Sequence, residues 1–158
     1  MSNPIILDTN LLILFIVGTV KKSYISAHKR LHPTYNEEHY DLLVAFMKLA
    51  SEMLVTPHTL AETSNLLDGI KEPAKTEIYK YFQSIIQRTQ ERYVESANAS
   101  KRPEFSYLHL TDSVLLELGK DNIVVLTADH LLHTKAIASG YEAINFWHEV
   151  ERGLDAPL

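Results

Sequence analysis

Cysteine is absent from the 158-residue sequence. Disulfide bonds, thiolate metal sites and cysteine nucleophiles are therefore excluded, which fits a reducing compartment. Long hydrophobic runs are absent as well. The stretch 11–17 holds seven apolar residues between polar neighbours, whereas a membrane-spanning helix needs about 20. We therefore expect a cytoplasmic protein with no secretory signal and no membrane segment.

Repeats and low-complexity tracts are also lacking. A hydrophobic content of 46% with 22% charged residues excludes a disordered chain. The length fits one domain with a core of its own. We expect a single domain over residues 1–158, with its core at about 4–146, a basic irregular insertion at 19–37 and a C-terminal tail at 147–158.

Acidic residues are missing between Thr9 and Asn36, although the net charge of the chain is −5. The same stretch carries basic residues among tyrosines and histidines; the basic ones are Lys21, Lys22, Lys29 and Arg30. Basic groups interleaved with aromatic rings suit a single nucleic-acid strand, in which phosphates are neutralised and bases stack. A solvated connection without any partner fits the composition equally well. The net charge does not decide the partner.

Short apolar runs alternate with helical patterns along the chain. Strands are expected at 5–7, 54–55, 123–126 and 143–146, and helices at 10–18, 38–53, 57–67, 73–96, 111–119 and 128–139. Apolar runs without polar alternation are typical of strands buried on both faces. The pattern therefore predicts an α/β fold with three layers, α/β/α, around a short and mainly parallel central sheet.

Four acidic residues occupy positions of special interest: Asp8, Glu62, Asp112 and Asp129. Asp8 and Asp129 follow two predicted strands, and ligands of parallel α/β sheets bind beyond the carboxyl ends of the strands. Carboxylates gathered in one patch repel one another unless divalent cations lie between them. The residues therefore indicate a site for Mg²⁺ or Mn²⁺, which prefer oxygen ligands.

Each of these residues also has a simpler explanation. Asp8 and Asp129 could cap the helices that follow them. Asp112 could be a favourable charge in the first turn of a helix that Thr111 caps. Glu62 could be a solvated helix residue.

Taken in order, the four local motifs resemble those of the PIN-domain family of metal-dependent ribonucleases, which includes the VapC-type toxins. The motifs are Asp8-Thr9-Asn10 after a strand, Leu60-Ala61-Glu62 in a helix, Leu110-Thr111-Asp112 at a helix start, and Thr127-Ala128-Asp129 after a strand. The resemblance spans residues 4–146 and implies a PIN-like fold.

The resemblance also implies a mechanism. Asp8, Glu62, Asp112 and Asp129 would be catalytic residues that hold one or two Mg²⁺ or Mn²⁺ ions for the hydrolysis of RNA. Asn10 and Thr127 would hold the ligands or the scissile phosphate. The basic residues of 19–37 would grip single-stranded or structured RNA, and the implied protein partners are an antitoxin and a second copy of the chain.

Two other functions stay open at this point. A PIN-like module without activity could bind RNA or a protein. A phosphatase of the haloacid-dehalogenase type also begins with a strand that ends in Asp, but its chemistry wants a second acid two positions later, where this chain has Asn10.

Overall fold

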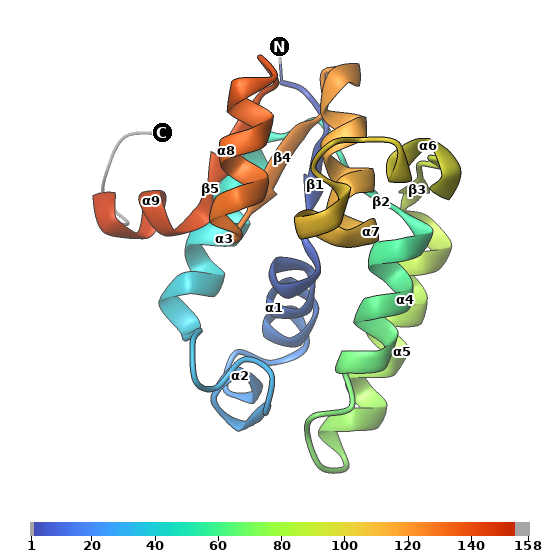
Figure 1. Cartoon of the computed structure of the whole chain (residues 1–158). Coiled ribbons are helices and arrows are strands. Elements are labelled where there is room, and N and C mark those ends of the chain that lie inside the picture. Colours follow the sequence, from blue (N-terminus) through green and yellow to red (C-terminus); the bar gives the residue numbers. More distant parts are fainter. Residues whose placement is uncertain (1, 154–158) are drawn as a thin grey trace.

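The computed structural model describes residues 2–153, so the end of the predicted tail, 154–158, lies outside the described residues. Its centre is a five-stranded sheet in the order β3-β2-β1-β4-β5, and all of the pairings are parallel (Figure 1). The strands are β1 (Ile5–Leu7), β2 (Met53–Val55), β3 (Gln90–Glu91), β4 (Val124–Thr127) and β5 (Ala143–Asn145). The predicted α/β class with a short parallel sheet is confirmed.

Helices follow the strands in the expected alternation. They are α1 (Thr9–Val20), α2 (Tyr24–Ala27), α3 (Glu37–Leu49), α4 (Pro57–Leu66), α5 (Ala74–Arg88), α6 (Ser96–Ser100), α7 (Phe105–Leu118), α8 (His130–Ala138) and α9 (Phe146–Arg152), with a 3₁₀ turn at Gly119–Asp121. Several begin at polar residues whose side chains bind the first helical N–H groups. Asn36 caps α3 in this way, and Thr56 caps α4 ahead of Pro57.

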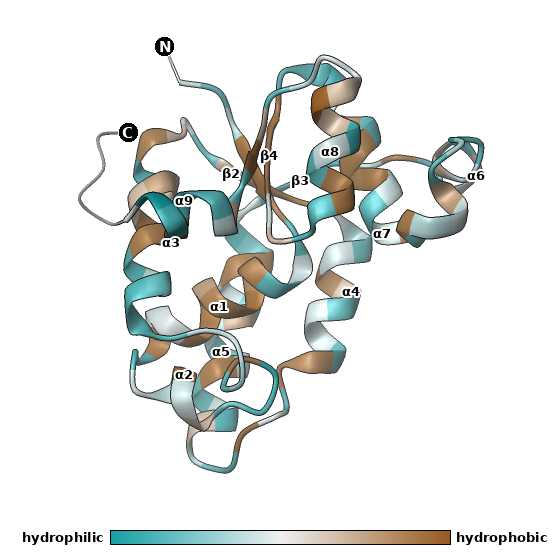
Figure 2. Ribbon diagram, turned by 60° about the vertical axis from the view of Figure 1, so that its left-hand side comes forward, coloured by the Kyte–Doolittle hydropathy of each residue, from teal (hydrophilic) through white to brown (hydrophobic). Residues whose placement is uncertain are grey.

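Helices cover the sheet on both faces, which gives three layers. Ile5 and Leu7 point into a core built with α1, α3 and α5, whereas Ile6 points into a second core built with α7 and α8. This alternation explains why β1 reads as an unbroken apolar run. In Figure 2 the hydrophobic colour marks much of β4 and of α1, the helix that follows β1.

The strand order creates a switch point between β1 and β4. The chain steps from β1 to β2 and β3 in one direction, then returns to the other side of β1 for β4 and β5. Helix α1, which follows β1, packs in the core on one face of the sheet, and α8, which follows β4, packs in the core on the other. A crevice therefore opens at the carboxyl ends of β1 and β4. Asp8 stands at one of these ends and Thr127 closes the other.

The segment predicted as one helix, 73–96, is divided. Helix α5 ends at Arg88, and the chain then forms strand β3 and helix α6. Tyr93, which lies within the range predicted as a helix, is 74% exposed. The reason is that β3 is a two-residue edge strand with the polar sequence Gln90-Glu91, which carries no apolar pattern. Helix α6 begins at Ser96, where the predicted helix was expected to end.

The insertion at 19–37 is more ordered than its composition indicates. It contains the short helix α2, and its side chains Ile25, His28, Leu31 and Tyr35 are buried. The predicted end of α1 at Gly18 is wrong, since the helix continues to Val20. Gly18 instead makes room for Tyr40 of α3, because a Cβ atom at this position would lie 2.2 Å from a ring carbon of Tyr40.

Among residues 2–153, no helix combines the length and the apolar character that crossing a bilayer requires. The longest is the amphipathic α5, which packs against α1 and buries Ile78, Phe82 and Ile85.

Candidate active site

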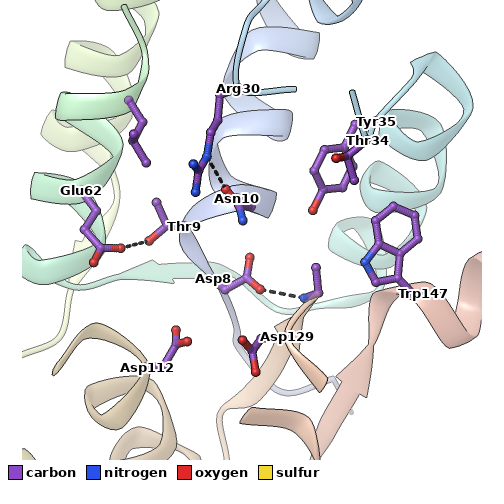
Figure 3. A pocket seen from close by; sticks show the side chains of 12 residues that line it. Asp8, Thr9, Asn10, Arg30, Thr34, Tyr35, Glu62, Asp112, Asp129 and Trp147 are labelled. Carbon is purple, nitrogen blue, oxygen red and sulfur yellow. Dashed lines mark hydrogen bonds between the residues drawn. The ribbon is translucent and has the colours of Figure 1, made fainter. Parts of the chain in front are cut away.

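A cavity of about 490 Å³ lies at the switch point. Its lining includes all four of the acidic residues singled out in the sequence: Asp8, Glu62, Asp112 and Asp129. They come from four different parts of the fold, namely the ends of β1 and β4 and the helices α4 and α7 (Figure 3). Positions far apart in the chain therefore share one cavity, as the strand order requires.

Asp8 is the most deeply placed of the four, with 6% of its surface exposed. Its Oδ1 accepts a hydrogen bond from the Leu11 N–H at 3.0 Å and so caps α1. Its Oδ2 accepts from the Thr127 hydroxyl at 2.6 Å and from the Ala128 N–H at 2.7 Å. Burial raises the pKa of Asp8, and these three hydrogen bonds oppose that rise. Asp8 is therefore both a helix cap and a clamp between β1 and β4.

Asp129 also combines a cap with a place in the cavity. Its Oδ1 accepts from the Leu132 N–H at 2.9 Å, at the start of α8. The Asp129 N–H in turn donates to the hydroxyl of Thr127 at 2.9 Å. Thr127 is fully buried. Its hydroxyl thus connects the carboxylate of Asp8 with the backbone of Asp129.

Glu62 projects from α4 and is held by two hydroxyl groups. Oε1 accepts from Thr9 and Oε2 from Thr111, each at 2.7 Å. Thr111 was predicted to cap a helix, and this is wrong. Helix α7 is broken at His109, which has φ 66° and ψ −173°, a strained conformation for a residue with a side chain. Thr111 lies within the helix beyond this break and turns its hydroxyl to Glu62.

Of the four carboxylates, that of Asp112 lies in the environment that stabilises its negative charge least. No residue of the described range 2–153 donates a hydrogen bond to its carboxylate, although the side chain is partly buried. Burial raises the pKa of Asp112 to about 7, and the negative charges of Asp8, Asp129 and Glu62 add to this effect.

The chemistry of the four side chains fits a hard divalent cation, because every donor is a carboxylate oxygen. Their present positions are not those of a formed metal site. Within residues 2–153, no group of three or more potential ligands is arranged to hold an ion. The hydrogen bonds give the physical reason, since Glu62 is turned to two hydroxyls and Asp8 to three donors. Ion binding would require Glu62 to exchange its hydroxyl partners for the cation.

The wall opposite the carboxylates differs in character. Arg30 lies there, and its Nε donates to Oδ1 of Asn10 at 3.0 Å. Asn10, expected to hold a metal ligand or a phosphate, thus positions an arginine. Tyr35 and Trp147 complete this wall. Neither ring was predicted as part of the site from the sequence. The sequence signal that could have pointed to Tyr35 was its position within the basic segment 19–37.

Of the four basic residues expected to bind substrate, the structure brings only Arg30 to the cavity. Lys22 pairs with Asp41 at 2.6 Å, and the amino group of Lys21 lies 5.5 Å from the ring centre of Tyr24. Lys29 lines a separate depression. The insertion therefore contributes one cation to the site instead of a basic patch.

We predict that Asp112→Asn stabilises the metal-free protein at neutral pH. A carboxyl group whose pKa rises from 3.8 to about 7 on folding favours the folded state below about pH 4 and loses this contribution as the pH rises through 7. The melting temperature of the variant should exceed that of the wild type by several degrees at about pH 8 and match it at about pH 4. Asp121→Asn, on the exposed 3₁₀ turn, is the control and should change neither value.

Asp8→Ala should have the opposite effect. The substitution leaves two buried donors and one helix N–H without an acceptor, which costs about 2 kcal/mol or more of unfolding free energy. Asp129→Ala removes a cap but also a negative charge that repels Asp112, so it should cost no more than about 1 kcal/mol. Urea denaturation measures both values. Equal losses for the two variants would contradict the clamp between β1 and β4.

No family model matches this chain, and neither a curated protein nor a solved structure matches it. The likeness to PIN-domain ribonucleases therefore rests on the four motifs of the sequence. The structure adds that these motifs border one cavity at the switch point of a parallel sheet.

Proposed function

We propose that the protein is a divalent-metal-dependent endoribonuclease that hydrolyses phosphodiester bonds of RNA. The observation that carries the proposal is the meeting of four carboxylates, from four separate elements, around one cavity. Such a cluster costs stability in the absence of a cation, as the raised pKa of Asp112 indicates. A fold that retains this cost has a use for a cation at this place.

The other residues that line the cavity limit which reaction mechanisms are possible. Among residues 2–153, no serine, histidine or lysine lines the cavity, so the lining offers neither a serine–histidine catalytic triad nor a histidine general base. The hydroxyl of Thr9 is engaged by Glu62. A bound Mg²⁺ or Mn²⁺ would supply an activated water and offset the charge of the phosphodiester.

The side chains divide the remaining work. Asp8 is oriented by Thr127 and cannot turn away from the cavity without losing three hydrogen bonds. Asp112 and Asp129 offer oxygens beside it, and Glu62 can exchange its hydroxyl partners. Arg30, on the opposite wall, provides a positive charge for a phosphate.

The competing functions fit the geometry less well. A phosphatase of the haloacid-dehalogenase type needs an acid two positions after the first Asp, whereas Asn10 stands there and accepts a hydrogen bond from Arg30. A module without activity would carry the repulsion among the carboxylates for no purpose. The resemblance extends the proposal to a toxin that an antitoxin protein inhibits and that forms a homodimer.

The proposal predicts cleavage of single-stranded RNA that requires Mg²⁺ or Mn²⁺ and stops on addition of a chelator. Asp112→Asn should lower the rate by at least about 100-fold, because it removes a cation ligand worth several kcal/mol in the transition state. This variant is preferable to Asp8→Asn, which would also disturb the clamp. Asp121→Asn should cleave at the wild-type rate. Activity of Asp112→Asn equal to that of the wild type would exclude the proposal.

Cation binding should also be visible without any substrate. Mn²⁺ at about 100 times its dissociation constant should stabilise the folded protein by about 2.7 kcal/mol through mass action. This corresponds to a rise in melting temperature of about 5–10 °C for a chain of this size. The rise should be much smaller in Asp112→Asn. A melting temperature that is the same in Mn²⁺ and in chelator would count against the metal site.

A further inference from the structure

The wall of the cavity that faces the carboxylates carries hydrogen-bond donors without acceptors. They are the hydroxyl of Tyr35, the indole N–H of Trp147 and the terminal N–H groups of Arg30, and within residues 2–153 none of them has an acceptor. Figure 3 shows all three side chains directed toward the space above Asp8. We call Arg30, Tyr35 and Trp147 the donor wall.

The two rings of the donor wall are held firmly. Tyr35 is 7% exposed, and its ring stacks on that of Trp147 with centroids 5.4 Å apart and an angle of 21° between the planes. His39 packs edge-on against Trp147 at 5.2 Å. The backbone N–H of Trp147 donates to Oδ1 of Asn145 at 3.0 Å. The donors are therefore in place before a ligand arrives, and little conformational entropy is lost on binding.

Arg30 is positioned by two contacts. Its side chain donates to Asn10, and its backbone N–H donates to Nδ1 of His28 at 3.2 Å. His28 is fully buried, and its Nε2 lies 3.0 Å from the carbonyl oxygen of Leu67. A ring nitrogen that accepts from Arg30 leaves the other nitrogen to donate to Leu67, so the imidazole is neutral. The buried part of the insertion thus fixes where the arginine stands.

The donor wall selects for an acceptor-rich occupant. Arginine and indole cannot accept hydrogen bonds, and burial together with the charge of Asp8 raises the pKa of Tyr35, so its hydroxyl stays protonated. A protein segment that offered lysine or arginine to the carboxylates would leave these donors unsatisfied at a cost. An anionic group with several oxygens satisfies them and meets the carboxylates through cations.

We infer that the donor wall binds a phosphodiester of a single-stranded nucleic acid, with Arg30, Tyr35 and Trp147 as binding residues, and this inference rests on the proposed function. A single strand is required because Asp8 lies at the bottom of the cavity with 6% exposure. A phosphate close to it must enter the cavity, and a cavity of about 490 Å³ is the size of a small-molecule site and does not admit a duplex.

The chain offers a direct probe, because Trp147 is its single tryptophan. The experiment uses full-length Asp112→Asn, so that the ligand is not cleaved, with a short end-labelled oligonucleotide and with Mg²⁺ raised to offset the weaker cation binding expected of this variant. Single-stranded RNA should change the tryptophan fluorescence saturably, with the dissociation constant given by the anisotropy of the label. Single-stranded DNA shares the phosphodiester and tests whether the ribose hydroxyl contributes; binding of either strand supports the inference. The same sequence as a duplex should leave the fluorescence unchanged.

Substitutions in the same background separate the donors. Arg30→Ala should weaken binding by about 10-fold or more, since it removes a charged contact to phosphate. Tyr35→Phe removes one donor and keeps the ring, whereas Trp147→Phe replaces the indole and its donor with a smaller aromatic ring. Each should weaken binding by about 3- to 10-fold, as measured by the anisotropy of the label. Lys48→Ala removes an equal charge from the exposed far end of α3 and should change binding by less than about 2-fold.

The inference is overturned if the strand binds without a fluorescence change, or if Arg30→Ala and Tyr35→Phe bind it as tightly as their parent. Failure of the nuclease proposal gives a different result. In that case the strand binds through the donor wall, but the wild-type protein does not cleave it in Mg²⁺ or Mn²⁺. If the wild type cleaves RNA and Arg30→Ala does so with an unchanged KM, the nuclease proposal stands and the donor wall is rejected as the binding surface.

Discussion

The buried carboxylate of Asp8 joins the two strands between which the chain reverses its direction. It accepts hydrogen bonds from the start of α1 on one side and from Thr127 and Ala128 on the other. β1 and β4 are therefore held at their carboxyl ends by a charged group that is almost inaccessible to water. The clamp fixes the start of α1 and, through the Thr127 hydroxyl, the backbone of Asp129, whose side chain caps α8.

The carboxylate of the clamp also adds to the electrostatic repulsion among the acidic residues of the site. One carboxylate is stabilised by three donors, but the carboxylate of Asp112 stands close by with no donor from the described residues and with its pKa raised to about 7. Glu62 relieves part of the repulsion by binding two threonine hydroxyls. A fold selected for stability alone would place apolar or amide side chains here. The cost falls on the same residues that could hold a cation, which is the trade expected at a functional site.

The sequence allowed the central strands and the four acidic residues to be predicted, and the reasons are physical. β1 and β4 are buried on both faces, so their apolar runs are unmistakable, and a polar residue directly after such a run must lie at the sheet edge where ligands bind. β3 could not be predicted, because an edge strand of two polar residues has no pattern. The break of α7 at His109 was equally hidden, since no glycine marks it. The place of Trp147 in the cavity lining could not be predicted, because it depends on a contact with Tyr35, which is distant in the chain.

The insertion at 19–37 shows how composition can mislead about function. Its lysines and arginine predicted a basic patch, yet Lys22 is bound to Asp41 and only Arg30 reaches the cavity. The segment instead positions two groups of the cavity wall. His28 and Tyr35 are buried, and they fix an arginine and a tyrosine hydroxyl opposite the carboxylates. A mobile basic segment would attract any polyanion over a long range. In the proposed function, a single arginine held at the cavity wall would act at short range on a phosphate inside the cavity, and so would help to select the bond that is cleaved more than to attract the strand.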